Sequence, residues 1–258
     1  MRSKLHLLVF IFLISLPAIA QEAEKKDSVP AHKVILIPYD PRYYLSDADR
    51  DIAEQSNQDP KKFRATFHQT VDRYVQRAIG GSYECISLLN DTADRLEQTL
   101  GEIMGRTGYK YEKAIPITPK APKEGLSIFQ TVKPDEKSHN DSRTATQYIP
   151  VSGDAMYMRA VVTRPQELFK KLNEEYQADI FVFLTQLEIK TNYKSCMDIA
   201  NQIYRREIML HFTVYDIHGN LLAGSYATSY FPSNSNTTGK IIGDCFPELA
   251  YYVAGCLP

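Results

Sequence analysis

The stretch "REIMLHFTVYDIHGNLLAGSYATSYF" (residues 206–231) carries the clearest pattern in the chain. Apolar side chains occupy every second position of its first half, at Ile208, Leu210, Phe212 and Val214. Gly219 and Asn220 supply turn residues, and the chain then returns through Tyr226 and Tyr230. Alternation with a period of two, joined by such a turn, predicts a β-hairpin.

The segments on both sides of this hairpin alternate between helix-like and strand-like patterns. A helix is predicted at 163–176, opening with a capping box of Thr163 and Gln166, and a strand at 179–191. Residues 240–255 predict a last helix. The first half predicts a strand at 33–41, a helix at 60–79, a strand at 83–89 and a helix that ends near Gly108.

The order of these elements indicates the fold class. Early strands that alternate with helices predict parallel pairing, and the hairpin adds antiparallel strands. We therefore expect an α/β (α+β) fold, in which helices cover a mixed sheet of about four to six strands. Residues 112–153 are rich in proline and have little to bury, so they predict an insertion, with one short strand at 126–132, inside a single domain of residues 33–258.

The first residues have the pattern of a signal peptide. Arg2 and Lys4 precede an apolar run that extends to Leu16, and Ala18-Ile19-Ala20 matches the small-x-small pattern of a cleavage site. The run is shorter than the roughly 20 residues of a membrane span, which disfavours the alternative of an uncleaved anchor. We expect cleavage near Ala20, a flexible leader over 21–32, and a periplasmic or secreted protein with no stable membrane insertion.

Composition narrows the classes of partner. The formal net charge is -1 and the pI is near 6.6, whereas nucleic-acid binding needs clustered positive charge. We therefore expect no nucleic-acid partner. The chain has no Trp beside 17 Tyr, which disfavours a sugar site because such sites often use indole faces, although tyrosine rings stack as well.

Four cysteines follow the signal segment and allow three disulfide connectivities. Cys85 lies within a predicted strand, where we expect a small core residue. The disulfide candidates are Cys196, Cys245 and Cys256, which flank predicted loops. No pair has the C-x-x-C spacing of zinc or thioredoxin-like sites.

Three aspartates alternate at Asp47, Asp49 and Asp51, as they do at the start of an EF-hand calcium loop. Such a loop also needs Gly at its sixth position and Glu at its twelfth, where this chain has Ile52 and Gln58. We therefore interpret the aspartates as the start of a helix whose N-cap is Ser46, because acidic side chains are favourable near a helix N-terminus.

The sequence contains no recognisable catalytic motif. No two histidines lie four residues apart, and a G-x-S-x-G nucleophile elbow is absent from the sequence. We expect neither a metal nor a cofactor. Tyrosine is enriched in protein interfaces, and it also packs on strand faces. Our interface candidates are Tyr226, Tyr230, His218 and Tyr251.

Three segments resemble a group of bacterial envelope domains: "KVILIPYDP" (33–41), "YQADIFVFLTQLEI" (176–189) and the hairpin at 206–231. They are similar to the periplasmic α/β domains of the curli secretion channel, the penicillin-binding-protein activator lipoproteins and the amino-terminal domain of TolB. Those domains share a strand that ends in Pro, an Ala-Asp start of a central strand and a hairpin turn after Asp. Ala178-Asp179 and Asp216 stand at the last two points here.

The resemblance implies a non-enzymatic envelope protein of a Gram-negative bacterium. The chain departs from the group because no lipid-anchor cysteine follows Ala20, and because it lacks the paired amphipathic hairpins of a membrane channel. We expect a protein-interaction or assembly module that binds other envelope proteins or itself, through the hairpin, its sheet edge and residues 112–153. The alternative is a secreted hydrolase or small-ligand-binding protein with a site built from scattered residues.

Overall fold

The computed structural model describes residues 32–89, 94–115, 117–120 and 155–258. The predicted signal peptide, the predicted leader up to residue 31 and the strand predicted at 126–132 lie outside these residues. All of these described residues belong to one compact unit. In chain order the elements are β1 (Lys33–Ile37), the 3-10 helix η1 (Pro41–Tyr43), β2 (Tyr44–Ser46), α1 (Asp49–Ser56), α2 (Pro60–Gly80), β3 (Glu84–Ser87), α3 (Asp94–Arg106), β4 (Thr107–Lys113), β5 (Met156–Val162), α4 (Pro165–Tyr176), β6 (Ile180–Asp198), β7 (Ile203–Asp216), β8 (Leu221–Pro232) and α5 (Thr238–Gly255).

A mixed sheet of six strands in the described residues confirms the predicted fold class. Its order is β3-β1-β6-β7-β8, and β2 also pairs with β6. Strands β3, β1 and β2 are parallel to their partners, whereas β6, β7 and β8 are antiparallel to one another. The predicted hairpin is β7–β8, and its turn contains Gly219 with φ 80°, a conformation that glycine adopts without strain.

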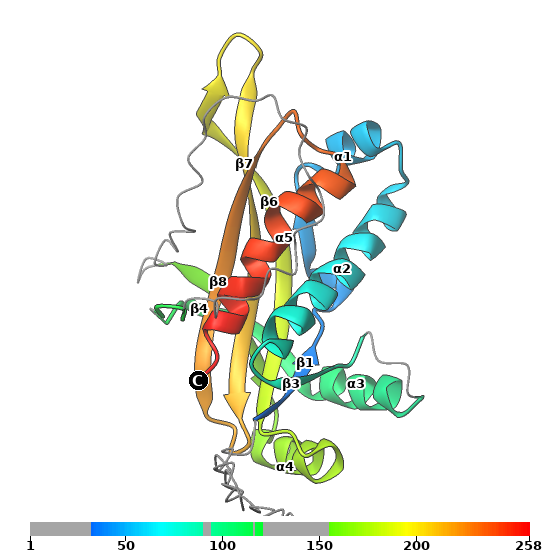
Figure 1. Ribbon diagram of the computed structural model, residues 1–258, viewed down its shortest axis with the longest axis vertical. Helices are drawn as coiled ribbons and strands as arrows, with labels where there is room; N and C mark the ends of the chain where they lie inside the picture. Colours follow the sequence, from blue (N-terminus) through cyan, green and yellow to red (C-terminus); the bar gives the residue numbers. More distant parts are fainter. Residues whose placement is uncertain (1–31, 90–93, 116, 121–154) are drawn as a thin grey trace, which may run out of the picture. The chain divides into compact units, whose positions relative to one another are not determined.

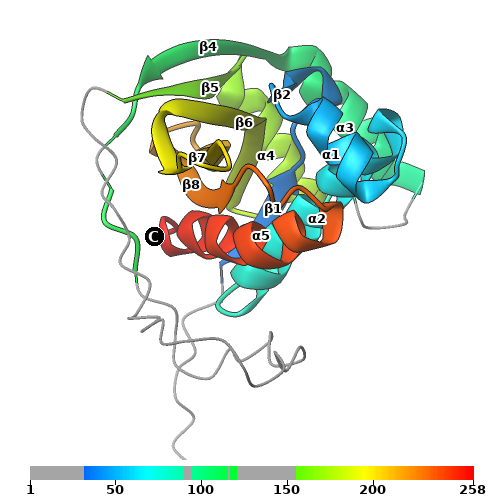
Figure 2. The same cartoon turned by 90° about the horizontal axis from the view of Figure 1, so that it is seen from above.

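Helices α2 and α5 lie side by side on one face of the sheet (Figures 1 and 2). Helix α2 starts at Pro60, and the Asp59 side chain caps it by accepting a hydrogen bond from Lys61 N at 2.7 Å. Buried side chains then recur every four residues along α2, at Phe63, Phe67, Val71, Val75 and Ile79. This spacing places them in one stripe against the apolar face of the sheet, where they form the larger core.

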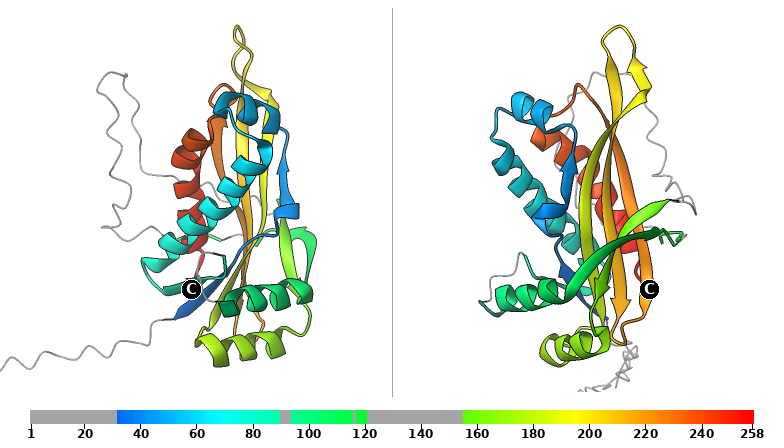
Figure 3. Two further views of the ribbon diagram at one scale, coloured as in Figure 1. Left: turned by 90° about the vertical axis from the view of Figure 1, so that its right-hand side faces the viewer. Right: turned by 180° about the vertical axis from the view of Figure 1, so that it is seen from behind.

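The opposite face of the sheet is covered by α3, α4 and the β4–β5 pair (Figure 3). Near α4 this face is apolar, and the Phe169 ring stacks on Phe181 with centroids 4.4 Å apart. Further along, β5 crosses strands β6, β7 and β8, and Tyr157 reaches Gly224 of β8. A Cβ added to Gly224 would lie 2.0 Å from the Tyr157 hydroxyl oxygen, so this contact requires glycine.

Polar side chains of the sheet hydrogen-bond the backbone of β5 where it crosses. His211 Nδ1 accepts from Met158 N at 3.0 Å, and Thr213 Oγ1 accepts from Ala160 N at 3.1 Å. The hydroxyls of Thr185 and Tyr215 donate to the carbonyl oxygens of the same two β5 residues, both at 2.6 Å. A buried strand edge needs partners for its backbone groups, and these four side chains provide them.

The start of α1 differs from the prediction in its cap. Ala48, not Ser46, is the N-cap residue, and it makes no side-chain cap bond. Ser46 ends β2 and its Oγ accepts a hydrogen bond from Ala48 N at 3.1 Å, so it stabilises the turn that precedes the helix. The prediction was wrong because β2 occupies residues up to Ser46 by pairing with β6.

The predicted capping box of Thr163 and Gln166 is also wrong. The N-cap of α4 is Arg164, with φ 51° and no side-chain cap bond. The helix predicted to end near Gly108 ends at Arg106, because β4 begins at once and pairs with β5. Residues 112 and 113 therefore belong to a strand rather than to the predicted insertion.

Strand β6 continues well beyond its predicted end at residue 191. Together with the start of β7 it forms a second hairpin, whose end projects past the helices (Figure 1). The β6–β7 register is irregular after Asn192, with shifts on both sides of Cys196. We call residues 193–204 the hairpin tip.

Candidate functional site

The three aspartates at the start of α1 each bind a different partner. Asp47 accepts hydrogen bonds from the backbone N and the hydroxyl of Thr191, at 2.8 and 2.9 Å. Asp49 accepts from Tyr44 and Arg64, both at 2.7 Å. Asp51 pairs with Arg206. The carboxylates therefore attach the start of α1 to the sheet and to α2, as helix-start residues rather than as one shared ligand set.

Arg206 of β7 is the centre of a polar network at the base of the hairpin tip. Its side chain is only 5% exposed. Nε donates to Thr191 Oγ1 at 3.1 Å, and the two terminal nitrogens donate to Asp51 Oδ2 and to Asn236 Oδ1. Asn236 N in turn donates to Gln55 Oε1 at 3.0 Å. A buried guanidinium is stable only when it is paired and hydrogen-bonded, and this one satisfies both conditions.

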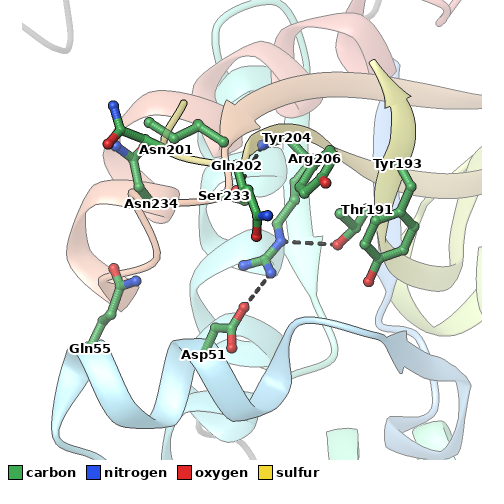
Figure 4. Close-up of a pocket in the computed structure, with 11 residues that line it drawn as sticks. Asp51, Gln55, Thr191, Tyr193, Asn201, Gln202, Tyr204, Arg206, Ser233 and Asn234 are labelled. Carbon is green, nitrogen blue, oxygen red and sulfur yellow. Dashed lines mark hydrogen bonds and ion pairs between the residues drawn. The ribbon is translucent and has the colours of Figure 1, made fainter. Parts of the chain in front are cut away.

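A cavity of about 470 Å³ lies over this network (Figure 4). Asp51 and Gln55 of α1 form one side of it, and the β6–β7 hairpin and the chain after β8 form the rest. Two of its residues, Tyr193 and Tyr204, make an edge-to-face contact with ring centroids 5.3 Å apart. Its lining residues are Asp51, Gln55, Thr191, Tyr193, Asn201, Gln202, Ile203, Tyr204, Arg206, Ser233 and Asn234.

The hairpin tip exposes three large hydrophobic side chains. Tyr193, Met197 and Ile199 are 68%, 59% and 85% exposed. They lie within seven residues of one another, at the end of the hairpin that projects from the sheet (Figure 1). Clustered apolar exposure of this kind is uncommon on monomeric proteins and marks contact surfaces.

The predicted interface residues are not brought together. Tyr226 and Tyr230 lie on the β5-facing side of β8, where Tyr226 packs on His211 and Tyr230 on Arg205. His218 is exposed in the β7–β8 turn. Tyr251 is half-buried on α5, which covers the other face of the sheet.

His211 is enclosed rather than open to a substrate. Its Nδ1 accepts from the β5 backbone, so Nε2 carries the proton, and Glu188 Oε2 is 3.9 Å from Nε2. Burial, together with the Lys190 charge, lowers the pKa of His211 to about 3. The neutral ring therefore serves as a structural acceptor at neutral pH.

All four cysteines are free thiols in the structure. Of the disulfide candidates, Cys245 is buried on α5 and Cys256 is buried directly after the last residue of this helix. The helical rise between them amounts to about 16 Å, beyond the reach of a disulfide. Burial raises the pKa of each of these thiols to about 12. Cys196 is exposed in the hairpin tip.

Sequence reasoning missed the hairpin tip and the cavity beside it. The only sequence signal was the run "NYKSCMDIANQIY" (192–204), in which strand alternation fails although apolar residues continue. Among the residues that the structure describes, no group of three or more His, Cys, Asp or Glu is placed to hold a metal ion. No helix in the described ranges is both long and apolar enough to cross a membrane. No family model and no curated protein matches this chain.

Proposed function

We propose that this protein is a non-enzymatic interaction or assembly module of the bacterial envelope, and that the hairpin tip is its principal contact surface. The observation that carries the proposal is the exposure of Tyr193, Met197 and Ile199 together at the end of a projecting hairpin. The signal-peptide pattern before Ala20 supports export, and the resemblance to periplasmic α/β domains supports a role in protein contacts.

Release of water from the exposed side chains of the tip would drive such a contact. Each of these side chains would contribute roughly 1.5–3 kcal/mol to the free energy of binding if a partner removed it fully from water. A hairpin tip reaches into a groove without moving the rest of the sheet, because its strands are anchored by β6–β7 pairing up to Asn192. The Arg206 network holds the base of the tip against α1. The tip is thus presented from a fixed base.

Site-specific photo-crosslinking in intact cells tests the proposal. A benzophenone side chain at position 199 should give a discrete adduct with an envelope protein or with a second copy of the chain. Position 170 on α4, where the Lys170 side chain is 76% exposed, serves as the control and should give none. Met197→Ser should weaken the adduct from position 199. Absence of any adduct from position 199, in cells where a known envelope pair crosslinks, would refute a role of the tip in contacts.

The cavity beside the tip favours a second candidate function, the binding of a small ligand. The cavity volume of about 470 Å³ falls within the range of small-molecule sites. A hydrolase has less support, because the buried ring of His211 is committed to the β5 backbone.

A further inference from the structure

We infer that the cavity between α1 and the base of the hairpin tip binds a short, neutral saccharide. The proposed contact role of the tip does not require such a site. Tyr193 takes part in both proposals, whereas Met197 and Ile199 belong to the tip contact alone and the cavity floor to the ligand site alone. Four features of the cavity carry the inference: its balanced charge, its uncommitted polar groups, its tyrosine rings and its fixed floor.

Charge balance disfavours an ionic ligand. Asp51 and Arg206 are the only charged residues that line the described cavity, and they pair with each other. All three nitrogens of the Arg206 guanidinium already donate to protein oxygens, so a carboxylate or a phosphate would have to compete with Asp51 for this charge. A cavity of this kind gains little from a charged ligand and suits a neutral one.

The lining offers hydrogen-bonding groups that no described protein atom uses. The second carboxylate oxygen of Asp51 has no protein donor within the described part of the chain. Within the same described residues, no hydrogen bond is made by the side-chain amides of Gln202 and Asn234 or by the hydroxyls of Tyr193 and Tyr204. Amides and hydroxyls combine donors with acceptors, and each sugar hydroxyl also needs both. The cavity therefore matches the polar chemistry of a saccharide.

Two tyrosine rings provide the apolar part of the site. Tyr193 is largely exposed, and its edge-to-face contact with Tyr204 fixes the angle between the two rings. A ring face that is free of protein contacts can pack on the C–H groups of a pyranose, as an indole does in other sugar sites. Tyrosine can thus fill the role left open by the lack of tryptophan in this chain.

The floor of the cavity is fixed before any ligand arrives. Asp47 holds Thr191, Thr191 accepts from Arg206, and Asn236 connects Arg206 to Gln55. Binding therefore costs little ordering of the floor, which favours recognition of weakly bound ligands such as sugars. The volume of about 470 Å³ accommodates a ligand of disaccharide size.

Saturation-transfer NMR on the purified protein tests the inference, with chitobiose, cellobiose and maltose as probes at millimolar concentration. We expect at least one of them to receive saturation. Tyr193→Ala should weaken the binding of that sugar about fivefold, because the sugar loses its stacking on one ring. Tyr193→Phe should retain most of the binding, because it keeps the ring.

Two control variants show whether the saccharide binds in the cavity. Tyr230→Ala removes an exposed tyrosine outside the cavity and should leave saccharide binding unchanged. Ile199→Ser should also leave it unchanged while it weakens the tip crosslink, so each proposal can fail alone. Saturation of none of the three sugars, equal saturation in Tyr193→Ala, or saturation only of an acetyl-trialanine-amide peptide would overturn the inference.

Discussion

Acid should destabilise this protein through His211, because the folded state needs the ring to be neutral. Nδ1 accepts the hydrogen bond from Met158 N at 3.0 Å. A proton on Nδ1 would replace this attraction by two opposed N–H groups. Burial and the positive charge of Lys190 lower the pKa of the folded ring to about 3, whereas an unfolded histidine titrates near 6.5.

The direction of the effect follows from these two pKa values. Above about pH 6.5 the histidine is neutral in both the folded and the unfolded state, and its titration takes nothing from the free energy of unfolding. As the pH falls from 6.5 towards 3, the unfolded state binds a proton that the folded state does not, so stability is lost. At pH 5 the unfolded pKa lies about 1.5 units above the pH, which corresponds to a loss of about 2 kcal/mol.

Urea unfolding at pH 7.5 and pH 5.0 measures this loss. His211→Asn keeps an acceptor oxygen near the position of Nδ1 and does not titrate, so its free energy of unfolding should fall by about 2 kcal/mol less than that of the wild type. His218→Asn, in the exposed β7–β8 turn, should behave as the wild type does. If His211→Asn loses as much stability as the wild type between the two pH values, the reasoning is refuted. The nearby Glu188 carboxylate, 3.9 Å from Nε2, would then be the group that keeps the ring protonated in the fold.

Three further predictions concern packing, the Arg206 network and the thiols. Gly224→Ala should destabilise by about 1–3 kcal/mol through the clash with Tyr157, whereas Gly243→Ala, which meets no neighbour on α5, should be neutral or stabilising in the same thermal melt. Asp51→Ala should lower the free energy of unfolding by about 2 kcal/mol, because it removes the anion beside the buried Arg206 charge. The control Asp244→Ala, at an exposed position of α5, should lower it by less than about 0.5 kcal/mol. Equal melting temperatures of the two variants would contradict this prediction. A thiol reagent should label Cys196 first in the native protein, and Cys245 and Cys256 only after unfolding, so rapid native labelling of all of them would show that α5 opens.

The sequence predicted those parts of the fold in which one face of an element is buried. Ile208, Leu210, Phe212 and Val214 alternate because α2 and α5 cover their side of β7. Asp59 and Pro60 mark the start of α2 by local chemistry that needs no distant partner. In both cases the cause of the structure lies within a few residues of the signal.

Other parts depend on contacts between distant segments and leave no local signal. Ser46 has the chemistry of an N-cap, but pairing of β2 with β6 moves the helix start two residues further on. Strand β5 is stabilised by His211 and Thr213, which lie 53 residues away in sequence. The end of β6 lacks alternation because bulges shift its register on both sides of Cys196.

Exposed apolar residues and buried polar residues are the two unusual classes in any fold, and in this protein they lead to different conclusions about function. The buried polar side chains His211, Thr213 and Arg206 all have structural partners, either the β5 backbone or the network around α1. Their chemistry is therefore used by the fold and needs no substrate to explain it. Ile199 and Met197 have no comparable role, because their side chains are exposed to water in the hairpin tip. Their exposure lowers the solubility of the isolated protein and does not stabilise its core. A partner protein whose surface covers these two side chains therefore explains their presence better than any contact within the chain does.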